Sequence, residues 1–226
     1  MDENGLDCLL VMGHNGIWER GWALIWWAYA LVIQRQVTEA LQAGQEALSV
    51  FEKLGNPFGL SVASGIILGA ISMAIGDTAA AKTHYLRGVE AGEEINYLRL
   101  LQISNDNLGT VALLEGDVQE AQQFFLKSLR ISQECGQTRE MLASLRDLAN
   151  VQIAQGNLDS ALKLLAVVLK HPTSGQNSLN RPERLRDEAE KLRAMIESQL
   201  DPALYQSAWE TGHRQRLADV VTQILN

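Results

Sequence analysis

The chain has 226 residues, a formal net charge of -8 and a sequence pI of about 5.0. This acidic balance argues against direct nucleic-acid binding, which needs basic patches to neutralise phosphates. Cys8 and Cys135 lie far apart without CxxC spacing, so neither a disulfide framework nor a zinc motif is expected. The acidic start, Met-Asp-Glu-Asn, is unlike a secretory signal, and we expect a cytoplasmic protein.

Residues 1–16 are expected to form part of a preceding helix and a loop. The run Asp-Cys-Leu-Leu-Val-Met at 7–12 reads as the tail of a second helix in a helical pair. This interpretation predicts that the chain is the last segment of a longer protein.

Residues 17–55 form a divergent first helical pair. Its positions Ala40, Leu48 and Gly55 align with later positions that are forty-one residues further on. The turn at 35–37, Arg-Gln-Val, lacks the Gly-Asp of the later turns and predicts the loss of one residue there.

Four of the five tryptophans lie in the first helix of this pair. Trp18, Trp22 and Trp26 are spaced i, i+4 and i+8, so they share one helix face. Core packing is the favoured interpretation, and a self-association surface is the alternative.

Three further segments repeat one another with a period of forty residues, which predicts a stacked repeat array. The matching positions are Leu68-Gly69, Leu108-Gly109 and Leu148-Ala149; Gly76-Asp77, Gly116-Asp117 and Gly156-Asn157; Ala81, Ala121 and Ala161; and Tyr85, Phe125 and Leu165. The predicted units cover residues 57–95, 97–136 and 138–172, and the whole array covers 17–172.

Each unit is expected to contain two antiparallel helices joined by a tight turn. The glycine suits the left-handed residue that ends a helix. The aspartate after it, Asp77 or Asp117, is interpreted as the N-cap of the next helix and not as a reactive group. The small residues let the two helices approach closely, and the residue at Tyr85, Phe125 or Leu165 fills the space one turn later.

The segment 58–75 is uncharged and contains Gly65 and Gly69 in a GxxxG pattern, which resembles a membrane span. Its eighteen residues are at the short end of what a bilayer requires. Because it is in register with charged helices of the next units, we interpret it as a buried first helix and expect no membrane contact.

Residues 173–226 are predicted to form a loop and C-terminal capping helices. The loop covers 173–180, a helix runs from Pro182 to about Leu200, and two short helices at 203–210 and 217–225 lie on either side of Gly212.

The Leu108-Gly109 pair, Ala121 and Phe125 resemble the motif of the tetratricopeptide repeat. The forty-residue unit, and the run from Tyr205 to Gly212 near the end, resemble the C-terminal arrays of bacterial signal-transduction ATPases and of LuxR-type regulators such as the maltose activator. The resemblance implies an all-α, right-handed superhelix of about four helix pairs closed by capping helices.

No catalytic, nucleotide-binding or metal-binding motif is found, so no catalytic residue, metal or cofactor is expected. The resemblance implies a non-catalytic scaffold that binds a protein or peptide, including the effector domain of a parent protein, at the sensor end of a larger signalling protein. The alternative is a receptor that binds a metabolite in the concave groove. The sequence does not predict the oligomeric state.

In such superhelices the first helix of each unit lines the concave face. Extending the repeat register predicts these binding residues: Trp22, Tyr29, Met73, Asp106, Thr110, Arg146 and Asn150. Asp106, Arg146 and Asn150 would hold a peptide backbone or a charged end, whereas Trp22 and Met73 would contact an apolar side chain. Asp106 and Arg146 are equally well placed to pair with each other.

Overall fold

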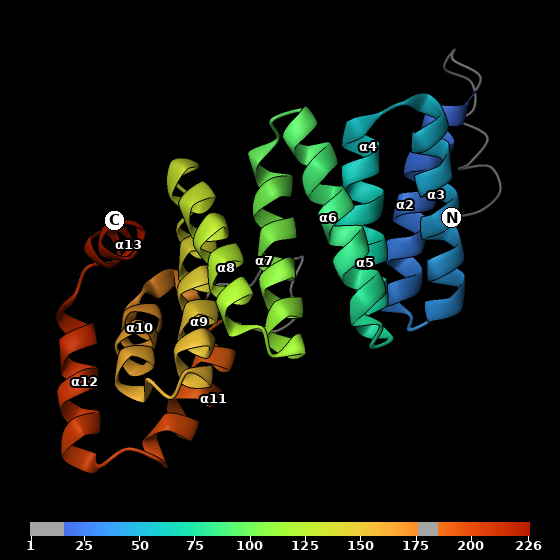
Figure 1. The fold of residues 1–226 in the computed structure, drawn as a ribbon. Coiled ribbons are helices and arrows are strands. Elements are labelled where there is room, and N and C mark those ends of the chain that lie inside the picture. The colour runs from blue at the N-terminus through green and yellow to red at the C-terminus, as the bar shows by residue number, and fades with distance from the viewer. Residues whose placement is uncertain (1–15, 176–184) are drawn as a thin grey trace. The chain divides into compact units, whose positions relative to one another are not determined.

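The computed structural model describes residues 16–175 and 185–226, and within these ranges the chain forms helices and turns without a strand (Figure 1). The predicted all-α class is confirmed. The chain packs as two compact units, the first ending at Val111 and the second beginning at Ala112. The predicted preceding helix and the helix start at Pro182 lie outside the described residues.

The first unit is built from paired helices. Helix α2 (Ile17–Ile33) packs against α3 (Val37–Leu54). Helix α4 (Pro57–Val62), the π-helix η2 (Ala63–Leu68) and α5 (Gly69–Ala74) follow one another without a break and pack together on α6 (Thr78–Glu94). Helix α7 (Leu98–Glu115) begins in this unit and ends in the second. The sequence analysis did not predict the π-helical segment.

The second unit contains the remaining elements. They are α8 (Val118–Glu134), α9 (Thr138–Ala154), α10 (Leu158–Lys170), the short 3-10 helix η3 (Pro172–Gly175), α11 (Leu185–Glu197), α12 (Pro202–Arg214) and α13 (Leu217–Leu225). The predicted break at Gly212 is wrong, because α12 continues through it. A Cβ atom at Gly212 would lie 2.3 Å from the carbonyl oxygen of Lys163, so this glycine serves a close contact between α12 and α10.

The turns between paired helices have the predicted chemistry. Gly76, Gly116 and Gly156 have positive φ angles of 79°, 82° and 79°, which glycine adopts readily. The carboxylates of Asp77 and Asp117 each accept a hydrogen bond of 2.9 Å from the backbone N–H three residues later. Their assignment as helix caps is therefore confirmed, and it accounts for their recurrence forty residues apart.

The first pair uses the same turn without a glycine. Arg35 takes the left-handed conformation, with a φ angle of 60°. Three residues, 34–36, separate α2 from α3, and three residues, 75–77, separate α5 from α6. The predicted loss of a residue is therefore wrong: the turn keeps its length, and an arginine occupies the position of the glycine.

Two glycines bring the first and second helices of the next pair into backbone contact. A Cβ atom at Gly88 of α6 would lie 2.5 Å from the Cα atom of Gly65, and one at Gly69 would lie 2.3 Å from the ring of Tyr85. The GxxxG pattern thus serves packing on α6. The stretch Pro57–Ala74 is the one described helical run that is long and apolar enough to cross a membrane, and 61% of it is buried, as in the core helix of a soluble protein.

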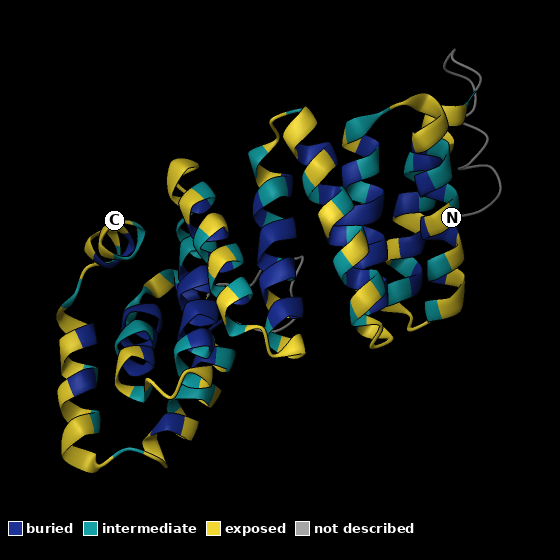
Figure 2. Cartoon of the chain, viewed as in Figure 1, coloured by how far each residue is buried: buried dark blue, intermediate teal, exposed yellow. Residues whose placement is uncertain are grey.

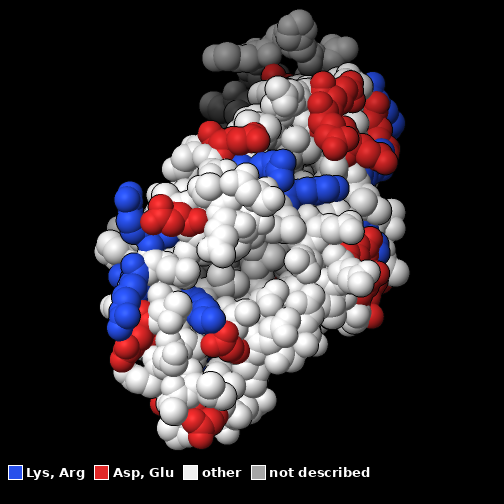
Figure 3. Space-filling model, turned by 60° about the vertical axis from the view of Figure 1, so that its left-hand side comes forward, with Lys and Arg blue, Asp and Glu red and all other residues white. Residues whose placement is uncertain are grey.

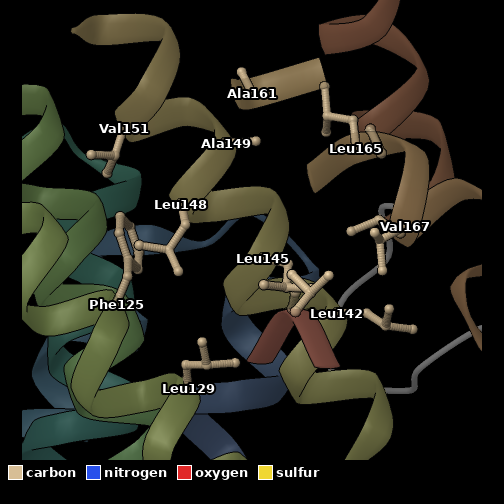
Figure 4. Packing of buried hydrophobic residues seen from close by; sticks show 14 of the residues in the cluster. Phe125, Leu129, Leu142, Leu145, Leu148, Ala149, Val151, Ala161, Leu165 and Val167 are labelled. Carbon is tan, nitrogen blue, oxygen red and sulfur yellow. The ribbon is translucent and has the colours of Figure 1, made fainter. Parts of the chain in front are cut away.

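Each unit has its own apolar core, and Figure 2 shows buried residues on the helix faces that meet neighbouring helices. In the first unit Phe51, Leu68 and Ile71 are fully covered. In the second, Phe125 of α8 lies beside Leu148 of α9, and Leu165 projects from α10 (Figure 4). Phe125 thus packs against a helix of the following pair, whereas Tyr85 packs on Gly69 of its own pair, as the period predicts.

The C-terminal helices are held by one cation and two aromatic rings. Arg193 of α11 lies over the ring of Trp209 at 5.7 Å and donates a hydrogen bond of 2.8 Å to the hydroxyl of Tyr205. Hydrogen bonds to Glu190 and then to Tyr205 raise the pKa of Arg193. These contacts connect α11 to α12.

Replacing Arg35 by glycine is expected to stabilise the chain by about 0.5–1 kcal/mol, because it removes the cost of a left-handed side-chain residue, partly offset by backbone entropy. Urea denaturation measures the change. Gln34→Gly is the control: the φ of Gln34, -81°, is ordinary, so glycine there should destabilise. Equal effects from the two substitutions would contradict the role given to Arg35.

Replacing Ala121 by leucine is expected to cost about 1–3 kcal/mol, because the methyl group of this residue is fully buried and the contact has no room. The shift of the urea midpoint at unchanged m-value measures this cost. Ala79→Leu, at an exposed position of α6, serves as the matched control and should leave the midpoint nearly unchanged. A harmless Ala121→Leu would disprove the tight helix contact.

Candidate functional site

The first unit contains an exposed row of aromatic side chains, Trp18, Trp22, Phe58 and Tyr97, which we call the aromatic row. Ring centroids are 5.9 Å apart between Trp18 and Trp22, 5.4 Å between Trp22 and Phe58, and 5.4 Å between Phe58 and Tyr97. The exposed fractions of Trp18, Phe58 and Tyr97 are 48%, 39% and 41%. The row therefore presents several adjoining rings to solvent.

Helix starts position the row. Trp18 is in the first turn of α2, Phe58 in the first turn of α4, and Tyr97 directly before α7. The side chain of Asn56 caps α4 by accepting a 2.7 Å hydrogen bond from the N–H of Gly59, and this fixes the turn that carries Phe58. The row thus joins the starts of three successive first helices.

Trp22 is the anchored member of the row. The centroid of its ring lies 5.2 Å from that of the fully buried Phe51, so Trp22 packs partly against the core of the first unit. Its indole Nε1 is buried and donates no hydrogen bond to any residue that the structure describes. Trp22 was predicted as a binding residue, and its partners Phe58 and Tyr97 were missed. A signal existed, since aromatic residues recur at 18, 58 and 97, close to the forty-residue period.

The other predicted residues of the first unit are placed differently. Tyr29 of α2 is exposed and lies 6.5 Å from Trp26, whereas Met73 of α5 is partly buried. On α7, Asp106 is only 2% exposed, and the exposed Thr110 donates its hydroxyl to the carbonyl of Asp106 at 3.1 Å. Their assignment to a binding face stays a prediction.

In the second unit, Arg146 is buried and forms two ion pairs. Its Nε donates to a carboxylate oxygen of Asp147 at 3.0 Å, and its guanidinium also pairs with Glu188 of α11. Only 8% of Arg146 is exposed, and Asn150 one turn later is partly buried. The charge of Arg146 thus ties α11 to α9. Its predicted pairing with Asp106 stays a prediction, because the two residues belong to different units.

His84 of α6 is a packing residue in this structure. Its Nδ1 lies 3.2 Å from the hydroxyl of Ser64, which also donates to the backbone carbonyl of His84 at 3.1 Å. Burial lowers the pKa of His84, and the nearby Arg87 lowers it further, while Asp77 acts in the opposite direction. Ser64 is fully buried, so its contact with His84 lies inside the packing between η2 and α6.

Charge and metal-binding geometry bear on the kind of ligand. On the face drawn in Figure 3, lysine and arginine side chains alternate with aspartate and glutamate and form no continuous basic stripe. Across residues 16–175 and 185–226, no group of three or more His, Cys, Asp or Glu side chains is placed to hold a metal ion. The most distinctive surface chemistry is therefore the aromatic row.

Comparison with known protein families finds a match for one region of the chain. A model of the tetratricopeptide repeat matches residues 99–171, which include α8, α9 and α10. A comparison with curated proteins finds no match. Residues 99–171 are thus a helical repeat of the tetratricopeptide type, within an all-α fold, as the sequence predicts. Repeats of this type generally mediate protein–protein interactions and typically serve as non-catalytic scaffolds.

Replacing Arg146 by methionine is expected to destabilise the chain by about 3 kcal/mol, because it leaves the carboxylate of Asp147 buried without this cation. Arg130→Met, at an exposed position of α8, is the control in the same unit. Chemical denaturation of both variants measures the difference. If Arg146→Met were no more harmful than Arg130→Met, Arg146 would be available for a ligand.

Proposed function

We propose that this protein is a non-catalytic scaffold that binds an extended peptide segment of a partner protein across the aromatic row. The observation that carries the proposal is the exposure of three rings that belong to successive first helices. Exposed apolar patches on soluble proteins often mark interaction sites, and aromatic residues contribute strongly to binding energy.

The spacing of the row suits an extended chain. Alternate side chains of an extended segment are about 6–7 Å apart. The neighbouring ring centroids of the row are 5.4–5.9 Å apart. An extended partner segment with apolar residues at alternate positions would therefore place successive side chains against successive rings. Such a segment needs little charge, because the row itself contains none.

We further propose that the scaffold is the sensor or regulatory end of a larger bacterial signalling protein in the cytoplasm. Support comes from the forty-residue unit and from the C-terminal run between Tyr205 and Gly212, which resemble those of bacterial regulators. In that setting the bound segment belongs to another protein or to the effector domain of the parent.

The test is a selection of displayed peptides on the full chain, followed by affinity measurement on variants. Selected peptides are expected to lose at least about tenfold in affinity when Phe58 and Tyr97 are both replaced by serine, since each exposed ring contributes about 1 kcal/mol or more. Leu114→Ser is the control, because Leu114 is more exposed than either ring and lies outside the row.

Peptides that bind the double variant as tightly as the wild type would contradict the proposal. Stabilisation by metabolites and not by peptides, measured as a thermal shift that disappears in the double variant, would instead support the small-molecule receptor.

A further inference from the structure

Helix α6 ends with charges that are unfavourable for a helix. Glu90, Glu93 and Glu94 are exposed near its C-terminus, and its last turn contains no basic residue. The carbonyl groups at a helix C-terminus carry partial negative charge, so acidic side chains are repelled there and basic ones are attracted. The last turn of α3 follows this rule, because it contains Lys53. We call the three glutamates the acidic end of α6.

The glutamates of the acidic end also repel one another. Glu90 is three residues before Glu93 and four before Glu94, and like charges at these spacings destabilise a helix. Within the ranges that the structure describes, none of the three forms an ion pair or a side-chain hydrogen bond. Arg87, one turn earlier, is instead paired with Glu52 of α3. No ion pair therefore offsets the cost of the acidic end.

The acidic end adjoins one end of the aromatic row. The backbone N–H of Tyr97 donates to the carbonyl of Gly92 at 3.0 Å, and that of Asn96 donates to the carbonyl of Glu93 at 3.0 Å. These hydrogen bonds close the C-terminus of α6 and hold Tyr97 directly after its last turn. The ring centroid of Phe58 is 5.4 Å from that of Tyr97. A segment that follows the row past Phe58 and Tyr97 therefore arrives at the acidic end.

The net charge at this end of the row is negative. Residues 90–99 contain three acidic side chains and one basic side chain, Arg99, which leaves a surplus of two negative charges. Locally unfavourable choices in a folded chain are expected where they serve function. The acidic end costs helix stability and has no partner within the first unit, so the position of these charges fits a positively charged group that comes from outside.

We propose that the segment bound by the aromatic row carries a lysine or arginine one or two positions beyond the residue that packs on Tyr97, and that this basic side chain contacts the acidic end of α6. The inference rests on the proposed function, because the row supplies the apolar contacts and the acidic end adds the charge. Long basic side chains lie along apolar surfaces while their charged ends reach further. A segment with an acidic residue at that position is repelled, so the acidic end also selects against such partners.

The experiment starts from a random peptide library selected on the full chain, and keeps the peptides whose binding is lost when Phe58 and Tyr97 are both replaced by serine. These peptides are expected to contain a lysine or arginine beside their apolar residues. Replacing that residue by uncharged norleucine should weaken binding to the wild type about fivefold. On the variant with both Glu93→Gln and Glu94→Gln the same replacement should change binding by less than about twofold.

Glu39→Gln is the matched control, because Glu39 is an exposed carboxylate of the same unit in the first turn of α3. This variant should keep the fivefold difference between the lysine and norleucine peptides. A second readout is thermal unfolding. Because the double glutamine variant removes repulsion at the end of α6, its midpoint should rise by about 1–2 °C. A midpoint that does not rise would remove the reason to assign these charges to a partner.

The outcomes separate this inference from the proposed function. Peptides that depend on the aromatic row but lack a basic residue overturn the inference alone. So do peptides whose norleucine forms bind equally well, or whose lysine forms bind the double glutamine variant as tightly as the wild type. A library that yields no peptide dependent on the row contradicts the proposed function, and the inference with it.

Discussion

The structure depends on close approach between the two helices of each pair, which is possible only where one helix presents a very small residue. At Gly65 and Gly88 the two backbones nearly touch, and at Gly69 the ring of Tyr85 lies against the other backbone. Forty residues after Tyr85 stands the buried Phe125, and the buried Ala121 likewise repeats the small residue Ala81. In the first unit this packing holds the α4–η2–α5 run on α6, and the start of that run carries Phe58 of the aromatic row.

The fold was largely predictable because its determinants are local and periodic. The Gly-Asp turns combine a left-handed backbone position with a helix cap, and both can be recognised from residue type alone. The left-handed conformation of Arg35 was not predicted, because a residue other than glycine adopts it only at a cost in free energy. The role of Gly212 in a close helix contact was not predicted, because the sequence does not distinguish such a glycine from one that ends a helix.

The candidate site was harder to predict, because side-chain partners depend on tertiary contacts. The repeat register predicted that Arg146 lies on a binding face. In the structure it pairs with Glu188, which is forty-two residues further along the chain and outside the repeats, so the periodic pattern could not predict this ion pair. The same register identified Trp22 and missed Phe58 and Tyr97, which lie at helix starts and not on the stripe that was extended. That Asp106, Thr110 and Asn150 belong to a binding face stays a prediction, because it also rests on the repeat register alone.

The π-helical segment at Ala63–Leu68 has a consequence for how this helix relates to its neighbours in other repeats. Hydrogen bonds between residues five apart accommodate one residue more than the α-helical pattern does. The segment therefore acts as a one-residue insertion absorbed inside a helix, and it turns Pro57–Val62 by about 100° relative to Gly69–Ala74 compared with a regular helix. Phe58 reaches the aromatic row from one side of this phase change, while Gly69 meets Tyr85 from the other. The run Pro57–Ala74 can therefore present Phe58 to the aromatic row and Gly69 to Tyr85, although a regular α-helix would turn these two residues toward different directions.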